Sequence, residues 1–454
     1  MIKIIEAVEF NDHFKSFSAG IVDEKVNAVV NEIIAAVRAE GDKAVRRYSE
    51  RFEKSVPAKF EIPPEAAKEA WESLESSEPK LAAALALSAK HIRRFSELQK
   101  EQFRDFEAEM ESGLFTGQRV IPVERAAVYV PGGRFPLVSS AFMTFIPAAV
   151  AGVREKILVS PPREDGLPDR RILAAAYLAG ADRIFALGGA QAVAALALGT
   201  ETVPRVDLIA GPGNKYVVAA KRLLFGEVGI DFLPGPTDVL VIAGERAKTG
   251  TDAAEAAARA ADLIAADMLA QAEHDPDACA RVLAPDRETA CLIEKALENR
   301  LAALSSADTA AAIAAASLDA GGLIIVYSSK EEAIDLANKI APEHLEIHAA
   351  SPEEWIGDLR NYGSLFIGSM AAEVLGDYSA GINHTLPTSG TARFTGGLSV
   401  RHFLKTVTTL RCAPGKGYAE ALAAAETIAR AEGLAAHAES AIARNNKYQL
   451  INKK

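Results

Sequence analysis

The chain has 454 residues, 49% of them hydrophobic and 24% charged, so it is long enough to form more than one hydrophobic core. The formal net charge of -11 argues against a nucleic-acid-binding surface, because phosphate recognition needs an excess of basic residues. Three widely separated cysteines without a CxxC pair exclude a disulfide framework and a thiolate metal cluster. Any metal must therefore be held by nitrogen and oxygen ligands.

The N-terminal segment carries Glu6 where a secretory signal would need apolar residues. Uncharged apolar runs also stay well below the roughly 18 residues that a membrane span requires. The sequence therefore predicts a cytoplasmic protein that binds neither membrane nor nucleic acid.

Helices are predicted first along the chain, because apolar residues recur every three or four positions over 22–48 and 64–106. From Val120 on, short β-rich runs alternate with Ala-rich helical ones. The predicted strands lie at 126–130, 156–160, 183–187, 207–210, 239–243 and 322–327. The helices between and after them lie at 140–153, 170–178, 190–198, 252–273 and 330–339. This βαβ alternation predicts an α/β fold with two Rossmann-like parallel sheets, followed by a strand at 406–411 and a long helix at 418–442.

Gly-rich turns follow three of the predicted strands, at 130–133, 187–191 and 210–214. Such turns lie at the carboxyl edge of a parallel sheet, where glycine lets backbone N–H groups approach a phosphate closely. No turn matches the GxGxxG fingerprint, and each by itself is more typical of an ordinary connection. Three in succession, with Gln191 and Asn214 adding polar groups, favour a nucleotide site at this edge.

Two segments of the second half combine acids or amides with histidine. Gln271 and His274 stand three residues apart at the end of a helix and share one of its faces, as half of a metal site would require. His274 is equally typical of an ordinary capping or surface residue. Glu343 and His344 are adjacent and can supply two proton-transfer groups to one cleft, but only if the backbone turns there.

Further candidates lie near the C-terminus. The segment 376–388 is unusually polar and turn-rich, and its Asp377 and His384 are competent zinc ligands or substrate contacts. Glu432 and His437 belong to the predicted Ala-rich helix. His437 is almost alone there as a polar group, and a surface histidine is the plain alternative.

Together these segments resemble the histidinol dehydrogenase family over residues 118–437. The resemblance rests on seven motifs in the family's order: VYVPGG, GGAQA, GPGN, the QAEH run, APEH, GDYSAGINHTLPT and EGLAAH.

The resemblance implies a zinc-dependent, NAD-linked alcohol dehydrogenase with one zinc ion per subunit. The implied zinc ligands, which also contact the substrate, are Gln271, His274, Asp377 and His437. The further implied substrate contacts are Thr237, His384 and Glu432. The implied dinucleotide contacts are Tyr129, Gln191 and Asn214. Glu343 and His344 would be the acid–base pair, with His344 removing the hydroxyl proton and Glu343 activating water in a second oxidation.

The resemblance also implies a homodimer in which the C-terminal tail completes the partner's site. On this view 1–20 is an N-terminal arm, and 21–128 with 238–392 forms a discontinuous α/β domain that carries most of the zinc site. Residues 129–237 would form the NAD-binding domain and 393–454 the tail.

The sequence departs from the biosynthetic members at Thr237-Asp238, where they carry Ser-Glu, and at 133–136, where Arg134 is similar to paralogues that oxidise sulfonated diols. An arginine there would suit an anionic substrate, or it would form a surface ion pair. Of the possible activities, we expect oxidation of L-histidinol. Because of these departures, oxidation of a small diol such as 2,3-dihydroxypropane-1-sulfonate is the alternative. A zinc- and nucleotide-binding protein without catalysis is a third possibility, which turnover of any alcohol would exclude.

Overall fold

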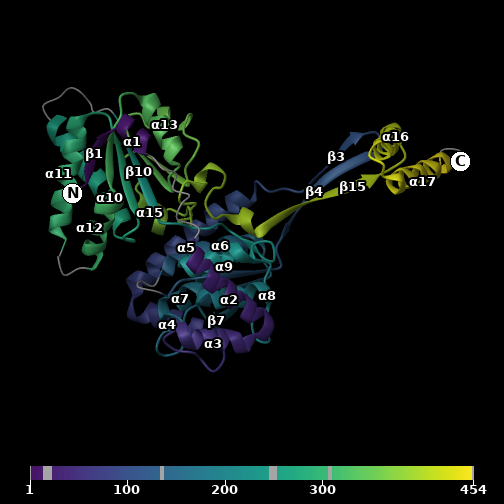
Figure 1. Ribbon diagram of the computed structural model, residues 1–454, viewed down its shortest axis with the longest axis horizontal. Helices are drawn as coiled ribbons and strands as arrows, with labels where there is room; N and C mark the ends of the chain where they lie inside the picture. Colours follow the sequence, from purple (N-terminus) through teal and green to yellow (C-terminus); the bar gives the residue numbers. More distant parts are fainter. Residues whose placement is uncertain (1, 14–22, 133–136, 245–252, 305–308, 452–454) are drawn as a thin grey trace.

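The computed structural model describes residues 2–13, 23–132, 137–244, 253–304 and 309–451. Over these residues the chain forms two α/β bodies and a long antiparallel arm that projects away from both (Figure 1). The predicted α/β fold with two largely parallel sheets is confirmed. Among the described residues, no helix is both long and apolar enough to cross a membrane.

The first sheet has the strand order β2-β7-β6-β5-β8-β9 and is parallel except for the edge strand β2. Its strands are β2 (Glu61–Ile62), β5 (Arg125–Tyr129), β6 (Glu155–Ser160), β7 (Arg183–Ala186), β8 (Leu208–Ala210) and β9 (Gly229–Ile230). The strand order reverses between β5 and β8, since β6 and β7 lie on one side of β5 while β8 and β9 lie on the other.

Helices cover both faces of this sheet. One face carries α2 (Glu24–Glu40), α3 (Asp42–Phe52), α8 (Gly189–Leu198) and α9 (Lys215–Leu224). The other carries α4 (Pro64–Ser77), α5 (Pro79–Lys100), α6 (Val138–Ala151) and α7 (Arg170–Ala179). Successive side chains of a strand point to opposite faces, so Ala127 joins the first core and Val128 the second.

The second sheet is parallel throughout, with the order β1-β12-β11-β10-β13-β14. Its strands are β1 (Lys3–Glu6), β10 (Asp238–Ala243), β11 (Cys279–Ala284), β12 (Leu323–Val326), β13 (His344–His348) and β14 (Ser364–Ile367). Its helices are α1 (Ala7–His13), α10 (Ala253–Ala272), α11 (Arg287–Ala303), α12 (Thr309–Gly321), α13 (Lys330–Ile340), α14 (Glu353–Ile356) and α15 (Glu373–Tyr378).

The expected domain division was wrong in two respects. Helices α2 to α5, which had been assigned with residues 238–392, pack on the first sheet, because their apolar faces join the cores around β5 and β6. The described part of the expected arm, residues 2–13, belongs to the second body, since β1 pairs in register with β12 of the second sheet.

The projecting arm consists of β3 (Phe106–Glu111), β4 (Leu114–Pro122) and β15 (Leu404–Cys412), paired antiparallel in the order β15-β4-β3. The helices α16 (Lys416–Ala431) and α17 (Ala435–Ile451) lie at its tip (Figure 1). The single long helix predicted over 418–442 is wrong: it is broken at Gly433, whose φ of 76° lies in the left-handed region. Two short 3-10 turns, Thr391–Arg393 and Val400–Phe403, precede β15.

Candidate active site

The carboxyl edge of the first sheet presents the Gly-rich turns. Tyr129 ends β5 and Asn214 follows β8, so the two flank the point where the strand order reverses. Doubly wound proteins bind their ligands at such a point. Helices α8 and α9 also begin at this edge, and their N-terminal N–H groups favour negative charge. The geometry is suited to the phosphates of a dinucleotide.

The three candidate cofactor residues have contacts within the chain. Tyr129 is buried, its hydroxyl accepts a hydrogen bond from the N–H of Gly189 at 3.1 Å, and burial raises its pKa to about 12. The amide of Gln191 donates to Glu53 at 3.0 Å. Asn214 is exposed and caps α9 by accepting from the N–H groups of the first helical turn. These contacts hold the turns after β7 and β8 in one conformation.

Glu53 was not found from the sequence. Its Oε1 accepts from the N–H of Gly188 at 2.7 Å and from Gln191, whereas its buried Oε2 has no hydrogen-bond partner among the described residues. Burial raises the pKa of this carboxyl group to about 7. A carboxyl at a helix end has no local sequence signal that would place it beside turns more than a hundred residues away.

The third turn is held by a buried ion pair. The carboxylate of Asp231 accepts from the N–H of Gly211 at 2.8 Å, and the ammonium of Lys221 donates to the carbonyl of Gly211 at 3.0 Å. Lys221 and Asp231 also form an ion pair with both side chains fully buried. Gly211 has a φ of 105°, so a residue with a Cβ would be strained at this position.

The acid–base candidates lie at the amino edge of the second sheet. His344 begins β13 and Asp238 begins β10, and the two strands are neighbours with Val239 opposite His344. Ala341 ends helix α13 in the left-handed conformation, with a φ of 52°, immediately before this segment. The chain also bends at Glu343, where the sequence required a turn, and Nδ1 of His344 lies 3.9 Å from Oε2 of Glu343 with both residues buried.

Glu343 is fixed by the segment that precedes β10. The hydroxyl of Thr237 donates to its Oε2, as does the N–H of Asp238 at 3.1 Å. The carboxylate of Asp238 accepts in return from the N–H of Glu343 at 3.3 Å. The departure at Thr237-Asp238 thus keeps a hydroxyl and a carboxylate in contact with Glu343. Arg134, the other departure, lies outside the described residues.

A cluster of nitrogen and oxygen donors lies beside His344. His274, Glu373 and Asp377 bring ligand atoms within 4.8 Å of one another, and the fully buried amide of Gln271 adjoins Glu373. Nε2 of His274 is 3.9 Å from Oδ2 of Asp377, and Nε2 of His344 is 3.6 Å from Oδ1 of the same carboxylate. Three of the predicted zinc ligands therefore come together, with Glu373 as an addition.

The hydrogen bonds of this cluster are compatible with a cation. Nδ1 of His274 lies 3.3 Å from the backbone carbonyl of Gln271, an acceptor, so this nitrogen carries the proton of the neutral ring. Nε2 then faces Asp377 with a lone pair, which is favourable only when a proton or a metal ion lies between them. Such an Nδ1–H to carbonyl bond is the usual support of a metal-binding histidine.

Gln271 fits the cluster in two orientations. In one, its amide nitrogen donates to the hydroxyl of Thr237 at 2.8 Å, and its oxygen faces the carboxyl group of Glu373. In the other, the nitrogen donates to both oxygens of Glu373 at 2.9 Å and the oxygen accepts from the hydroxyl of Thr237 at 2.8 Å, which then no longer donates to Glu343. The first orientation requires a proton or a cation near Glu373, and burial raises the pKa of Glu373 well above its ordinary value.

Burial and neighbouring charges set the protonation of the pair. Burial raises the pKa of Glu343 to about 7, although His344 and the hydroxyl of Thr237 oppose this shift. Burial lowers the pKa of His344, but the charges of Glu373, Glu343 and Asp377 outweigh it and raise the pKa well above its ordinary value. Nε2 of His344 is buried without a hydrogen-bond partner in the described part of the chain.

His384 joins the two bodies. Its Nδ1 lies 3.2 Å from the backbone carbonyl of Asp377, and its Nε2 lies 3.2 Å from the hydroxyl of Ser140 in α6. The neighbouring Asn383 donates to the carbonyl of Met143, also in α6, at 2.6 Å. Because α6 follows β5, its first turn lies at the carboxyl edge of the first sheet. His384 therefore connects this edge to the donor cluster that contains Asp377. Both ring nitrogens thus face groups of the chain itself, and a role for His384 as a substrate contact stays a prediction.

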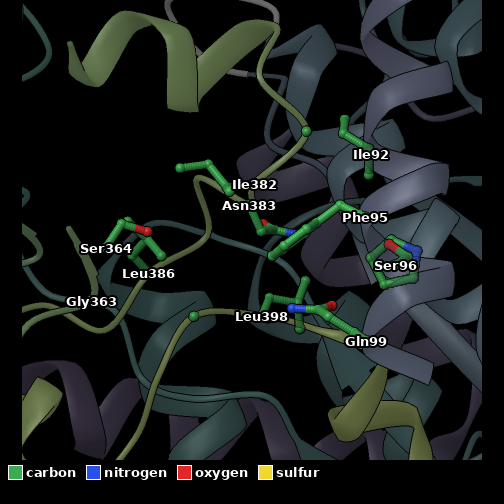
Figure 2. Close-up of a pocket in the computed structure, with 13 residues that line it drawn as sticks. Ile92, Phe95, Ser96, Gln99, Gly363, Ser364, Ile382, Asn383, Leu386 and Leu398 are labelled. Carbon is green, nitrogen blue, oxygen red and sulfur yellow. The ribbon is translucent and has the colours of Figure 1, made fainter. Parts of the chain in front are cut away.

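A small pocket lies next to this bridge (Figure 2). Its walls are the α5 residues Ile92, Phe95, Ser96 and Gln99 together with Pro147 and residues of 363–398. Its volume of about 160 Å³ is below the roughly 300 Å³ of the smallest usual ligand pockets, and it contains neither Glu343 nor His344. The pocket is therefore adjacent to the site and does not itself enclose the reacting groups.

Two predicted residues lie elsewhere within one chain. Glu432 and His437 are exposed on the helices at the tip of the arm, far from α10 and α15 (Figure 1). Glu432 ends α16 and His437 lies in α17, so the two are separated by the break at Gly433. A single chain does not bring them to the cluster. Glu373, by contrast, precedes Asp377 by four residues in α15, a spacing that could have identified it.

The fold and these clusters define an α/β enzyme. The carboxyl edge of its first sheet, which is suited to a nucleotide, lies next to the proton-transfer pair Glu343 and His344. A family model described as histidinol dehydrogenase matches residues 18–445. Over 418 residues the chain is 45% identical to the histidinol dehydrogenase of Thermus thermophilus, covering 92% of this chain and 94% of that protein. It is 42% identical to that of Pseudomonas aeruginosa over 448 residues, covering 98% and 95%.

A solved structure agrees with these sequence relatives. The crystal structure of histidinol dehydrogenase from Elizabethkingia anophelis matches with a TM-score of 0.87 and 31% identity, covering 98% of both chains. The chain therefore belongs to the histidinol dehydrogenase family, and it is an NAD-dependent oxidoreductase.

Proposed function

We propose that this protein oxidises L-histidinol to L-histidine through the aldehyde, using two NAD per substrate molecule. The observation that carries the proposal is that Glu343 and His344 are buried beside the donors Gln271, His274 and Asp377. Relatives that are 45% and 43% identical over 92% of the chain are histidinol dehydrogenases.

Zinc fits the donor set, which contains nitrogen and oxygen but no thiolate. Gln271, His274 and Asp377 would hold the ion, with His437 of the partner subunit as the fourth ligand and Glu373 adjacent. Three or four such ligands leave room for a substrate, as catalytic zinc sites require. When bound, zinc supplies a Lewis acid and a template that orients the alcohol. It would also offset the acidic charge that raises the pKa of His344.

The chain's own residues supply the proton transfers. His344, whose buried Nε2 lies 3.6 Å from Asp377 and makes no hydrogen bond within the described residues, would accept the hydroxyl proton, and NAD would supply the hydride acceptor. Glu343 then accepts a proton from water, which adds to the aldehyde before the second hydride transfer. Thr237 and Asp238 hold Glu343 in place for this step. NAD would lie at the turns that carry Tyr129, Gln191 and Asn214.

We also propose a cytoplasmic homodimer with a site shared between subunits. Glu432 and His437 are exposed at the tip of an arm that projects away from the described part of its own chain's site (Figure 1). Apolar side chains on the arm are exposed too, including Leu410 at 68% and Ile428 at 58%. Such a surface is typical of a protein interface. The three free cysteines agree with a reducing compartment.

The substrate is tested by NAD reduction with zinc-loaded protein. We expect turnover of L-histidinol and little or none of 2,3-dihydroxypropane-1-sulfonate or simple diols. The hydroxyl of Thr237 still donates to Glu343, and threonine brings no positive charge that would bind a sulfonate. Turnover of the sulfonated diol without turnover of histidinol would overturn the proposal.

The pKa of about 7 for Glu343 predicts a pH dependence of the second oxidation. Below this pH Glu343 is protonated and cannot accept a proton from water, so the rate falls about tenfold per pH unit. The measurement is the pH profile of NADH formation from the aldehyde. Glu343→Gln should be slow at every pH and lack the inflection. An inflection that persists in Glu343→Gln would assign it to another group.

A further inference from the structure

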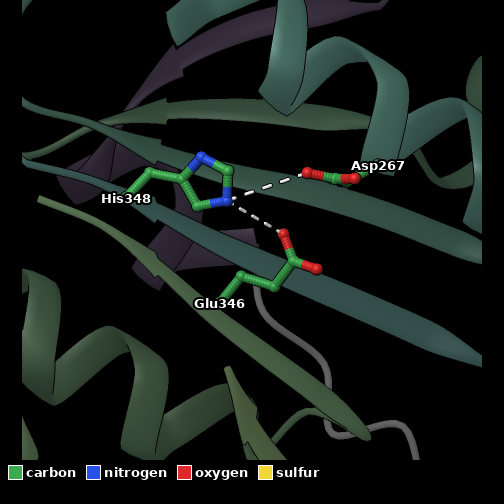
Figure 3. Close-up of side chains that lie close together, drawn as sticks. All are labelled: Asp267, Glu346 and His348. Carbon is green, nitrogen blue, oxygen red and sulfur yellow. Dashed lines mark hydrogen bonds and ion pairs between the residues drawn. The ribbon is translucent and has the colours of Figure 1, made fainter. Parts of the chain in front are cut away.

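A second cluster of possible metal-ligating side chains, partly to fully buried, consists of Asp267, Glu346 and His348 (Figure 3). Nε2 of His348 lies 3.2 Å from Oε2 of Glu346 and 3.7 Å from Oδ2 of Asp267. The side chain of Glu346 is fully buried, and that of His348 is 3% exposed. No proton-transfer step described above uses these residues.

Each member of the cluster belongs to an element that also carries a site residue. Asp267 precedes Gln271 by one turn of α10, so both side chains lie on the same helix face. Glu346 and His344 are two residues apart on β13 and point to the same face of the sheet. The cluster therefore connects helix α10, which carries the donor Gln271, with strand β13, which carries His344.

Glu346 extends this connection to a third element. Its Oε1 accepts a hydrogen bond from the N–H of Glu373 at 2.8 Å. Glu373 is the first residue of α15, and Asp377 lies one turn later in this six-residue helix. A carboxylate that binds the first N–H of so short a helix fixes where the helix begins, because few other contacts compete.

The hydrogen bonds argue against a second metal site here. Both oxygens of Glu346 already accept hydrogen bonds, from Glu373 and from His348. An imidazole that bound a metal through Nε2 would carry its proton on Nδ1, and this buried nitrogen has no partner among the described residues. When Nε2–H donates to Glu346, Nδ1 carries no proton. A buried acceptor without a partner costs less free energy than a buried N–H without one.

We propose that Glu346, which pairs with His348, is a positioning residue that sets α15 and thereby places Asp377 and Glu373 for the metal ion. This inference rests on the proposed function, because it assumes that zinc binds at Gln271, His274 and Asp377. Second-layer partners of metal ligands commonly change metal affinity by about 10- to 100-fold.

The test is the zinc dissociation constant of the full-length protein, measured by competition with a chromophoric chelator. Glu346→Leu removes both acceptor oxygens and should weaken zinc binding by about 10- to 100-fold. Glu346→Gln keeps an acceptor for the N–H of Glu373 and should stay within about threefold of wild type. His348→Leu leaves Glu346 in place, so its zinc dissociation constant should lie between those of the two Glu346 variants. This variant provides the test if Glu346→Leu does not fold.

The remaining outcomes each count against the inference. Wild-type affinity in folded Glu346→Leu, or an equal loss in Glu346→Gln, would overturn the positioning role. A second zinc equivalent in wild type that disappears in Glu346→Leu would make the cluster an ion site instead. Failure of the wild-type protein to bind one zinc per subunit would contradict the proposed function itself, which separates the two failures.

Discussion

Replacing His344 by glutamine is expected to lower kcat for histidinol oxidation by about 10²- to 10⁴-fold, the usual contribution of a positioned general base. The side chain remains polar and of similar size, but it can no longer accept the hydroxyl proton. Steady-state NADH formation by zinc-loaded protein gives the rate. Zinc affinity should change little, because His344 is not among the proposed ligands.

His402→Gln is the matched control. His402 is half-buried, its Nδ1 accepts from the N–H of Ser399 in a capping turn, and it is neither a proposed metal ligand nor a member of the acid–base pair. Its replacement should leave kcat near the wild-type value. An equal loss of activity in both variants would point to a general structural effect, and full activity in His344→Gln would remove His344 from the mechanism.

Mixing two inactive variants is expected to restore activity if the site is shared. His437→Ala lacks the ligand that the arm would bring to the partner, whereas His344→Gln lacks the base. Random exchange of subunits makes half of the dimers mixed, and one of the two sites in each mixed dimer is intact. Activity should therefore rise to about one quarter of wild type.

The complementation assay has its own control. Refolding or incubating each variant alone under the same conditions should give no recovery. If the mixture also stays inactive although subunit exchange is demonstrated, Glu432 and His437 do not complete the partner's site. Wild-type activity of His437→Ala alone would exclude this histidine as a ligand.

The sequence predicted the two sheets well because buried parallel strands are recognisable locally. The runs at 126–130 and 239–243 correspond to β5 and β10 within one residue at each end. The domain assignment of α2 to α5 failed for a physical reason. An amphipathic helix shows that one face is buried, but its pattern does not say which sheet covers that face.

The arm was the least predictable part of the fold. Strand β3 alternates apolar and acidic residues over 106–111, yet most of it is exposed, and β4 over 114–122 shows no such alternation. The break between α16 and α17 depends on the left-handed conformation of Gly433. A single glycine within an Ala-rich segment is compatible with a continuous helix, although it weakens one.

The candidate site was predicted in part. Gln271, His274, Asp377, Glu343 and His344 were found through the resemblance, and the fold brings them together. Glu53 was missed because only long-range packing brings it to Gly188 and Gln191. Glu373 was missed because it lies just before the polar, turn-rich segment 376–388, in which only Asp377 was singled out as a zinc ligand. Glu346 could not be distinguished by sequence from an ordinary strand residue that faces solvent.

The most direct test of the account is the stoichiometry of complete oxidation. A limiting amount of L-histidinol is converted by zinc-loaded protein with excess NAD, and both NADH and the amino-acid product are quantified. We expect two NADH and one L-histidine per histidinol, with this activity lost on chelation of zinc and regained when zinc is returned. One NADH with release of the aldehyde, or no NADH at all, would contradict it.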